Sequence, residues 1–559
     1  MIDYDKENLN PPILSVEEAV ERGSFFQFPP FFDPEQVGDF SKGMAEADCQ
    51  ILSAEIKLGS QYHFYMETNT ALAVPDEDSN MVVYSSTQIP EITQETIAQC
   101  LGLPANNIRV ITRRLGGSFG GKFLKAASVA TACAVAAYKL QRPVRTYVNR
   151  KADMIMAGGR HPMKITYTVG FKDSGKITAL KLDVLVDAGA FPDASIVIPG
   201  TIVGSLKKYD WGALNFDIKI CKTNLPNRTT MRAPGELQAA FIAETIIEHV
   251  ASTLSVEVDT VRSINLHTYN SLQFFYKSAA GEPMEYTLPA IWDKLATSSS
   301  FYQRTEMIQD FNRSSKWRKR GISRVPVLQE VSLKTAPGKV SILRDGSIVV
   351  EVGGIDMGQG LWTKVKQVAA YGLGLIKRGG TEELLEKVRV IQSDTLSLIQ
   401  GGITGGSTTS ESSCEAVRLC CNILVERLTS LKEKLMEQMG TLEWETLILQ
   451  AYQTSVNLSA STLFIPEPAS MNYLNYGAAV SEATSGEPPL LLAVSVHCAT
   501  RAAIVEARKQ LGFWNGWNGV DDSNSTAFQL EVPAIMPVVK ERCGLDSVEK
   551  FLQWTMGTK

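Results

Sequence analysis

Glu487 is the residue of this sequence best suited to accept a proton, because its neighbours constrain it. It stands between Gly486 and Pro488 in the run SGEPPLLLA, and a strongly apolar segment follows. Partial desolvation raises the pKa of a carboxyl group toward the range of a general base. The alternative is a glutamate in the first turn of a helix that only interacts favourably with the helix dipole. The residue alone leaves both interpretations open.

Two glutamines stand at element ends, where a polar ligand could meet them. Gln88 follows the strand-like run MVVYSS, and Gln359 lies in DMGQGLWT. A side-chain amide offers both a donor and an acceptor, which suits a heterocycle or an oxo group. Taken singly, either glutamine is more often a turn residue.

Arg232 comes shortly before Pro234 and Gly235 in MRAPGELQ, ahead of a predicted helix. A guanidinium at such a place can form paired hydrogen bonds with phosphate or metal-oxo oxygens. A surface ion pair is an equally good explanation of one arginine.

The run GGSTTSESS contains Thr409, Ser410 and Ser412 ahead of a second predicted helix. Its hydroxyls and backbone N–H groups form either an anion-binding nest or an ordinary helix N-cap.

Residues 114–123, RLGGSFGGKF, include Gly117, Phe119 and Gly120 and join a β-branched run to a helix-like run. The glycines therefore predict a strand-to-helix turn. Glycine lets backbone N–H groups approach a ligand closely, and a helix N-terminus favours an anion. The alternative, that the glycines only permit tight backbone packing, has equal weight on this stretch alone.

A nucleotide-binding loop is disfavoured at the same place. Gly116, Gly121 and Lys122 match a phosphate-binding P-loop, but Phe123 occupies the position of the Ser or Thr that contacts magnesium. The run also lacks the Gly-x-Gly-x-x-Gly spacing of dinucleotide-binding folds.

Two predicted hairpins, residues 163–191 and 340–360, each lead into a glycine-containing segment. We expect both hairpins to form sheet edges that carry a ligand loop. A polar, helix-rich stretch at 271–320 is the expected domain junction, and residues 411–439 and 490–511 are predicted to be helical. Hairpins alternating with helices indicate an α+β architecture of at least two lobes.

Composition narrows the class of protein. The 559 residues are 44% hydrophobic and 21% charged with a net charge of -5, which argues against a nucleic-acid surface. No apolar run is long enough to predict a membrane span, and the acidic start MIDYDKENLNPP does not resemble a signal peptide. Nine cysteines without metal-ligand spacing indicate thiols in a reducing compartment, so we expect a cytoplasmic protein.

Five motifs in a fixed order are more specific than any single residue: RRLGGSFGGK, MRAPGELQ, GGIDMGQGLWTKVKQ, GGSTTSESSCEAV and GEPPLLLA. Together they resemble the molybdenum-cofactor region of the xanthine dehydrogenase and aldehyde oxidase family, and most of all the plant aldehyde oxidases. The resemblance covers nearly the whole chain. It implies a two-lobed α+β domain that holds molybdenum through the pterin of molybdopterin, with no side-chain metal ligand.

The resemblance also implies residue roles. Glu487 matches the catalytic base of an oxidation of aldehydes to carboxylic acids in which water supplies the oxygen. The positions that match cofactor contacts are Gln88, Gly117, Phe119, Gly120, Arg232, Gln359, Thr409, Ser410 and Ser412.

Three substrate-pocket positions depart from the purine-oxidising pattern of the family. Phe123 and Gly200 replace the purine-binding glutamate and arginine, and Pro234 replaces a stacking phenylalanine. A purine would find few partners there, so the resemblance favours a small aldehyde as substrate.

The resemblance suggests residues 1–27 as a remnant of the preceding small α/β domain, 28–270 as the first lobe and 271–559 as the second. The 2Fe-2S and FAD domains of full-length relatives are expected to be absent.

Near 482–484 the family has about a hundred further residues, roughly the size of one small domain. That gap predicts that the chain as written loads little cofactor. The alternative function is a catalytically inactive homologue that pairs with other subunits, since full-length relatives form homodimers.

Overall fold

The computed structural model describes residues 10–543 except 31–32, 316–319, 377–380, 398–399, 469, 481–493, 513–529, 531, 533 and 535. The described chain forms two compact units. Unit 1 comprises residues 1–61, 159–330 and 473–559, and unit 2 comprises residues 62–158 and 331–472.

These units interleave along the sequence, so they differ from the expected lobes 28–270 and 271–559. The expected junction at 271–320 is helical, as predicted, but it lies wholly within unit 1. Residues 10–27 also belong to unit 1, where Phe26 N donates to Ile220 O at 2.9 Å and Lys222 N donates to Ser24 O at 2.9 Å. Linear composition could not reveal this interleaving, because each unit is completed by segments far apart in the chain.

Unit 1 is built on a four-stranded sheet of order β1-β6-β7-β8. Its strands are β1 (Cys49–Leu58), β6 (Met163–Phe171), β7 (Ile177–Asp187) and β8 (Ala213–Cys221). β7 pairs antiparallel with β6 and parallel with β8. Nearly all of β7 is buried, as expected of a strand covered on both faces.

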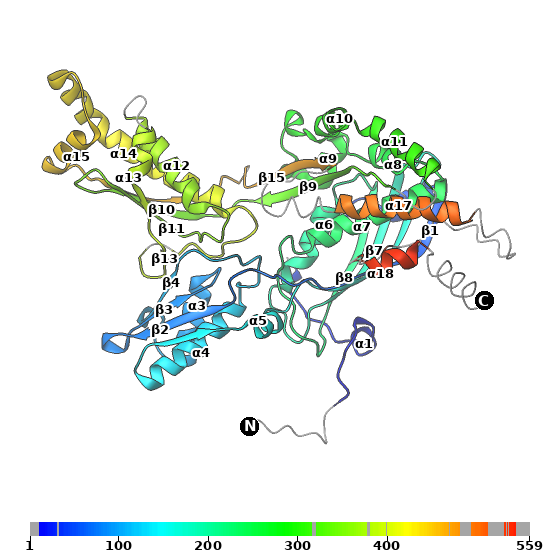
Figure 1. Ribbon diagram of the computed structural model, residues 1–559, viewed down its shortest axis with the longest axis horizontal. Helices are drawn as coiled ribbons and strands as arrows, with labels where there is room; N and C mark the ends of the chain where they lie inside the picture. Colours follow the sequence, from blue (N-terminus) through cyan, green and yellow to red (C-terminus); the bar gives the residue numbers. More distant parts are fainter. Residues whose placement is uncertain are drawn as a thin grey trace, which may run out of the picture. The chain divides into compact units, whose positions relative to one another are not determined.

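Helix α7 (Glu236–Leu254) is the central helix of unit 1 and is largely buried along its length. It contacts β1, and α6 (Ile198–Leu206) and α17 (Val494–Gly512) pack against α7 (Figure 1). The other unit 1 helices are α1 (Val16–Glu21), α2 (Phe40–Ala45), α8 (Val258–Ile264), α9 (Tyr269–Tyr276), α10 (Leu288–Ser298), α11 (Phe301–Ser314) and α18 (Met536–Arg542).

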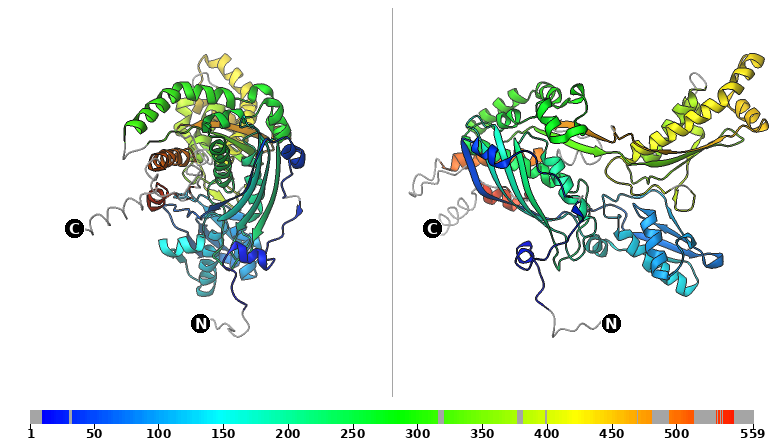
Figure 2. Two further views of the ribbon diagram at one scale, coloured as in Figure 1. Left: turned by 90° about the vertical axis from the view of Figure 1, so that its right-hand side faces the viewer. Right: turned by 180° about the vertical axis from the view of Figure 1, so that it is seen from behind.

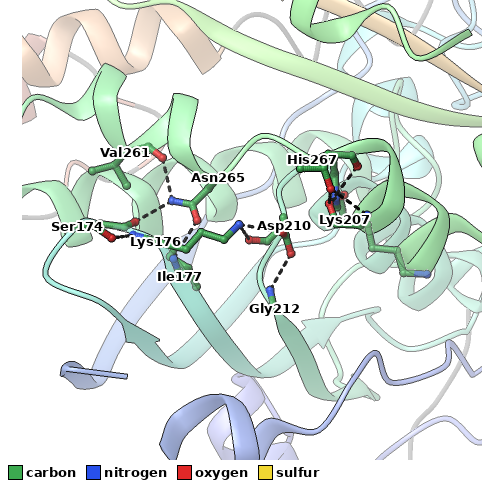
Figure 3. A network of polar contacts seen from close by, with 12 residues as sticks. Ser174, Lys176, Ile177, Lys207, Asp210, Gly212, Val261, Asn265 and His267 are labelled. Carbon is green, nitrogen blue, oxygen red and sulfur yellow. Dashed lines mark hydrogen bonds and ion pairs between the residues drawn. The ribbon is translucent and has the colours of Figure 1, made fainter. Parts of the chain in front are cut away.

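The β6–β7 turn is fixed by the buried side chain of Asn265, at the end of α8 (Figure 3). Asn265 Nδ2 donates to Gly175 O and to Val261 O, both at 2.8 Å, and Oδ1 accepts from Ile177 N at 2.9 Å. Lys176 next to the turn forms an ion pair with Asp210 at 2.7 Å. One amide thus ties α8 to the hairpin and sets the strand register.

Unit 2 contains two sheets. The first has the order β13-β4-β3-β2-β5, and α3 (Pro90–Leu101) and α4 (Lys125–Leu140) contact its strands and each other. Its strands are β2 (Thr70–Pro75), β3 (Met81–Ser85), β4 (Ile108–Thr112), β5 (Val144–Tyr147) and β13 (Ser393–Asp394), and α5 (Arg150–Ala157) follows β5. The alanine-rich buried side of α4 allows this close packing.

The second sheet of unit 2 has the order β12-β11-β10-β14, and α12 (Leu361–Gly374) and α14 (Thr409–Met439) pack against it and each other. α14 extends past this sheet toward α15 (Figure 2). The remaining elements are β10 (Ala336–Ile342), β11 (Ile348–Val352), α13 (Thr381–Lys387), β12 (Val388–Val390), α15 (Trp444–Gln453) and β14 (Ser459–Phe464). A separate two-stranded pair joins β9 (Val325–Ser332) to β15 (Asn472–Ala479).

Both predicted hairpins form, as β6–β7 and β10–β11, but the expectation that they are sheet edges was wrong. Each of the four hairpin strands, β6, β7, β10 and β11, has a second partner in its sheet and is therefore an internal strand. The additional partners are β1, β8, β12 and β14, which come from distant parts of the sequence.

No single helix among the described residues is long and apolar enough to cross a membrane. One bent pair, α7 with α8, meets the length and composition criteria only when its two helices are taken together.

Candidate functional site

The glycine loop of residues 114–123 is the predicted strand-to-helix turn, between β4 and α4. Gly117 and Gly120 have φ values of 86° and 99°, and Phe119 between them has φ 53° and is 42% exposed. A Cβ placed on Gly121 would lie 2.6 Å from Tyr65 Cε1. The loop therefore needs glycine both for its backbone conformation and for close packing.

Lys122 excludes the P-loop alternative for this turn. Its side chain is fully buried, and Nζ forms an ion pair with Glu67 Oε2 at 2.7 Å. The same carboxylate accepts from Gly116 N at 3.0 Å, and burial lowers the pKa of Lys122. Lys122 therefore fixes the loop from inside rather than reaching a phosphate.

Gln88 joins the glycine loop to a second loop of unit 2. Its Oε1 accepts from Gly120 N at 3.1 Å, and its Nε2 donates to Thr404 O at 2.9 Å. Its backbone N donates to Lys122 O at 2.9 Å, and its backbone O accepts from Thr404 N at 3.0 Å. The buried amide is thus used within the protein and holds two ligand-loop candidates together.

The loop after β11 meets the same two segments. Ile355 N donates to Thr404 Oγ1 at 3.0 Å, and Leu115 N donates to Asp356 O at 2.9 Å. Asp356 also accepts from Gly358 N at 3.0 Å and Trp362 N at 3.2 Å, which orders the turn into α12. Sequence analysis missed Asp356, although an acid shortly before a predicted helix start is a capping signal.

Gln359 lies on this loop and is exposed. Its Nε2 donates to Ile355 O at 2.8 Å, and its Oε1 accepts from Met357 N at 2.6 Å. Since both bonds are local to one exposed loop, Gln359 can exchange them for a ligand more readily than the buried Gln88 can.

The start of α14 presents polar groups that lack partners. Thr408 Oγ1, Ser412 Oγ and Ser413 Oγ are buried and have no hydrogen-bond partner among the described residues. Thr409 Oγ1 accepts from Gly405 N at 3.3 Å, and Ser410 lines an open groove of about 560 Å³ between α12 and α14. Unpaired buried hydroxyls at a helix N-terminus fit an anionic ligand rich in hydrogen-bonding groups. All three unpaired hydroxyls lie in the predicted run GGSTTSESS, and of the three only Ser412 was singled out by number as a cofactor contact.

Three further predicted residues, Gly200, Arg232 and Pro234, lie in unit 1, around the turn before α7. Arg232 and Pro234 flank Ala233, whose φ is 55°. A Cβ on Gly235 would lie 2.1 Å from Thr201 Oγ1, so α6 packs directly against this turn. Gly200 is an exposed residue of α6 with open space beside it, which brings Gly200 and Pro234 to one region of unit 1.

Arg160, which was not predicted from the sequence, supports the same turn through hydrogen bonds to its backbone. It is almost fully buried, and its guanidinium donates to Arg232 O at 2.6 Å and to Ala233 O at 2.9 Å. Burial lowers the pKa of Arg160 to about 10. The neighbouring His161 is paired with Ser195 Oγ at 2.8 Å, and burial lowers its pKa to about 3. The sequence GGRHP gave no signal specific enough to single out either residue.

The predicted site residues therefore fall into three groups. Unit 2 contains Gln88, Gly117, Phe119, Gly120, Phe123, Gln359, Thr409, Ser410 and Ser412. Unit 1 contains Gly200, Arg232 and Pro234, and Glu487 lies outside the described residues.

The described residues contain no cluster of three or more His, Cys, Asp or Glu side chains that could hold a metal ion. Cys420 and Cys421 are buried in the core of unit 2.

Comparison with protein families gives two matches. The family models that match residues 27–266 and 294–485 both carry the description "Molybdopterin cofactor-binding domain". Together they cover most of the chain.

Curated relatives include plant aldehyde oxidases. The chain is 55% identical to an indole-3-acetaldehyde oxidase and 53% identical to the abscisic-aldehyde oxidase of Arabidopsis thaliana, over 100% and 99% of its own length. It is 51% identical to an indole-3-acetaldehyde oxidase of Zea mays. The chain spans about half the length of these relatives, 49%, 48% and 48% respectively.

The alignment with the first of these relatives runs over 651 positions, which exceeds the 559 residues of the chain by 92. Because the alignment covers the whole chain, the relative contains segments that have no counterpart here.

Solved structures with the same fold include the aldehyde oxidoreductase of Desulfovibrio gigas, at a TM-score of 0.68 and 19% identity over 84% of this chain and 51% of that one. A Cu,Mo-CO dehydrogenase matches at a TM-score of 0.67 and 19% identity, over 79% of this chain and 60% of that one. Their low identity means that these structures support the α+β fold and nothing finer. Both family models and the plant relatives show that the chain belongs to the xanthine dehydrogenase and aldehyde oxidase family, and that it corresponds to the molybdopterin-binding region of that family.

Proposed function

We propose that this chain is the cofactor-binding and substrate-binding part of a molybdenum hydroxylase that oxidises aldehydes to carboxylic acids with water as oxygen source. The observation that carries the proposal is the convergence of three loops of unit 2. Gln88 bonds the loops at 114–123 and 401–409 to each other, and the loop at 353–360 bonds to both of them. Open glycine backbone and the unpaired hydroxyls of Thr408 and of the first turn of α14 belong to this part of unit 2.

Molybdopterin fits the residues present in unit 2, where Phe119 and Gly120, Gln359 and the hydroxyls at the start of α14 would hold it. For Arg232 of unit 1, the family resemblance implies a role as a cationic donor to the cofactor. The partial positive charge of the α14 N-terminus favours a negatively charged group there. When bound, the cofactor supplies the two-electron oxidation that side chains cannot perform.

Glu487 is the proposed general base. Its place between Gly486 and Pro488 restricts the backbone, so the carboxylate can be held in one direction for proton transfer. The proposed substrate is an aldehyde rather than a purine, because Phe123, Gly200 and Pro234 offer a purine no charged partner. The names of the plant relatives support the aldehyde class.

The cellular compartment and the oligomeric state are also part of the proposal. We propose a cytoplasmic homodimer, on the basis of the cysteine usage and of the family resemblance. Iron–sulfur and flavin groups outside the residues of this chain would carry the electrons from the cofactor to the electron acceptor.

A second candidate is a catalytically inactive homologue that acts as a dimerisation partner. The observation favouring it is the excess of 92 aligned positions in the relative, which is consistent with a missing wall of the site. We place the missing segment near 482–484, directly before Glu487.

Two proteins test these functions: the chain as written, and a segment-restored chain in which the homologous segment of a plant aldehyde oxidase follows Glu482. Both are purified from a host that makes molybdopterin and assayed with an aromatic aldehyde and a dye as electron acceptor. The proposal predicts turnover in the segment-restored chain. A folded, dimeric segment-restored chain without turnover would support the inactive homologue.

A further inference from the structure

Arg160 is the most completely bonded cation of unit 1 that the proposed mechanism does not use. Nε donates to Gln61 Oε1 at 3.1 Å, and Nη1 donates to Ala233 O at 2.9 Å and to Gln238 Oε1 at 3.3 Å. Nη2 donates to Arg232 O at 2.6 Å. The planar fork of a guanidinium is needed to reach acceptors spread in this way.

These acceptors are backbone carbonyls and neutral side chains, which is unusual for a buried cation. Other buried arginines of unit 1 have direct carboxylate partners, as Arg324 has in Asp259 at 2.8 Å and Arg262 has in Glu244 at 2.7 Å. Glu236 supplies an opposite charge to Arg160, but no hydrogen bond to a carboxylate is among its contacts with the described residues. A buried cation that bonds only neutral acceptors is costly, so its retention calls for a role beyond packing.

The turn that Arg160 bonds has a strained backbone at Ala233. Ala233 has φ 55° and Gly235 has φ 81°, and only glycine adopts such values without cost. Gln238 closes the turn from the other side, because its Oε1 also accepts from Gly235 N at 3.1 Å. Arg160 and Gln238 thus fix the two ends of the short segment that carries Arg232.

We propose that Arg160 is a positioning residue: its bonds to the carbonyls of Arg232 and Ala233 fix this turn and thereby aim Arg232 at the cofactor. The inference rests on the proposed function for the role of Arg232. The hold on the turn itself does not depend on any ligand.

The first test is hydrogen exchange of the chain as written. Arg160→Lys keeps the positive charge but cannot span the same acceptors. We expect exchange at Gly235 and Leu237 to speed up at least about tenfold, since two bonds from a charged donor are lost. Gln238→Met, a milder change, should act in the same direction if Arg160→Lys folds poorly.

Arg324→Lys is the matched control. Arg324 is equally buried in unit 1, donates to Asp259 and to Trp292 O, and bonds no residue of the turn. Its replacement should lower the melting temperature without faster exchange at Gly235 and Leu237. Unchanged turn exchange in a folded Arg160→Lys protein would overturn the proposal.

The second test measures molybdenum in the segment-restored chain. Arg160→Lys and Arg232→Met should each lower the content, and the double variant should be no worse than Arg232→Met alone, because both act through one side chain. An additive loss, or full content in Arg160→Lys, would contradict positioning. If the unsubstituted segment-restored chain holds no molybdenum, the proposed function fails, and turn exchange alone then decides the role of Arg160.

Discussion

At the scale of single residues, burial and existing partners decide which groups near the glycine loop remain open to a ligand. Lys122 is already paired with Glu67, and both amide ends of Gln88 are bonded. The hydroxyls of Ser412 and Ser413 are buried and have no partner among the described residues. The groups at the start of α14 are therefore the ones that gain most from a bound cofactor.

Ser412→Ala tests this difference. An unpaired buried hydroxyl costs about 1–3 kcal/mol, so its removal should leave the cofactor-free chain as stable as before or more stable. Molybdenum content of the segment-restored chain should fall at the same time. Ser195→Ala is the control, because Ser195 is buried but bonded to His161, and its loss should lower the melting temperature. A clear loss of stability in Ser412→Ala would show that the hydroxyl has a partner within the protein.

Glu487→Gln tests the proposed base. In the segment-restored chain we expect unchanged molybdenum content and a loss of aldehyde turnover of at least about 100-fold, since an amide keeps the shape but cannot accept the proton. Steady-state kinetics with a dye acceptor measure the effect. Turnover equal to that of the unsubstituted protein would remove Glu487 from the mechanism.

At the scale of elements, the sequence predicted individual turns and hairpins better than it predicted which strands pair with them in a sheet. The β4–α4 turn and both hairpins follow from β-branched runs and turn residues, and the structure contains them. The sheet positions of the hairpins could not be predicted, because β1, β8, β12 and β14 come from other parts of the chain. For the same reason, the sequence predicted a ligand-binding role for Gln88, which stays a prediction, but could not predict its bonds to Gly120 and Thr404.

Gln88→Leu should disconnect the loops. It leaves Gly120 N and Thr404 O without the amide, so we expect lower stability of unit 2 and lower molybdenum content in the segment-restored chain. Gln94→Leu is the matched control, since Gln94 is equally buried in α3 and its Nε2 joins two other backbone carbonyls, of Ala105 and Ile108. The control should lose stability but keep its molybdenum. Equal molybdenum loss in both variants would mean that stability alone sets cofactor content.

At the scale of the whole molecule, acid acts on unit 1 through its buried histidines. Burial lowers the pKa values of four histidines of unit 1: His161, His249, His267 and His497. Each ring therefore binds a proton less readily in the folded chain than in the unfolded chain, which takes one up at each histidine below about pH 6.5. Acid therefore favours unfolding, and the effect of His161 continues until the pH approaches its folded pKa of about 3.

We expect the free energy of unfolding of unit 1 to fall between pH 7 and pH 5. Within the titration window each histidine contributes about 1.4 kcal/mol per pH unit. Calorimetry of the chain as written measures the slope, and His161→Gln should make it shallower. Equal stability at both pH values would show that these rings are protonated in the folded chain.

The central proposal is that the loops of unit 2 around Gln88 hold molybdopterin. It is tested most directly by the molybdenum content of the purified segment-restored chain, measured by elemental mass spectrometry beside the chain as written. We predict stoichiometric molybdenum in the segment-restored chain and little in the chain as written, on the proposal that part of the site is missing near 482–484. A folded segment-restored chain without molybdenum would contradict the claim, and near-stoichiometric metal in the chain as written would contradict the role given to the missing segment.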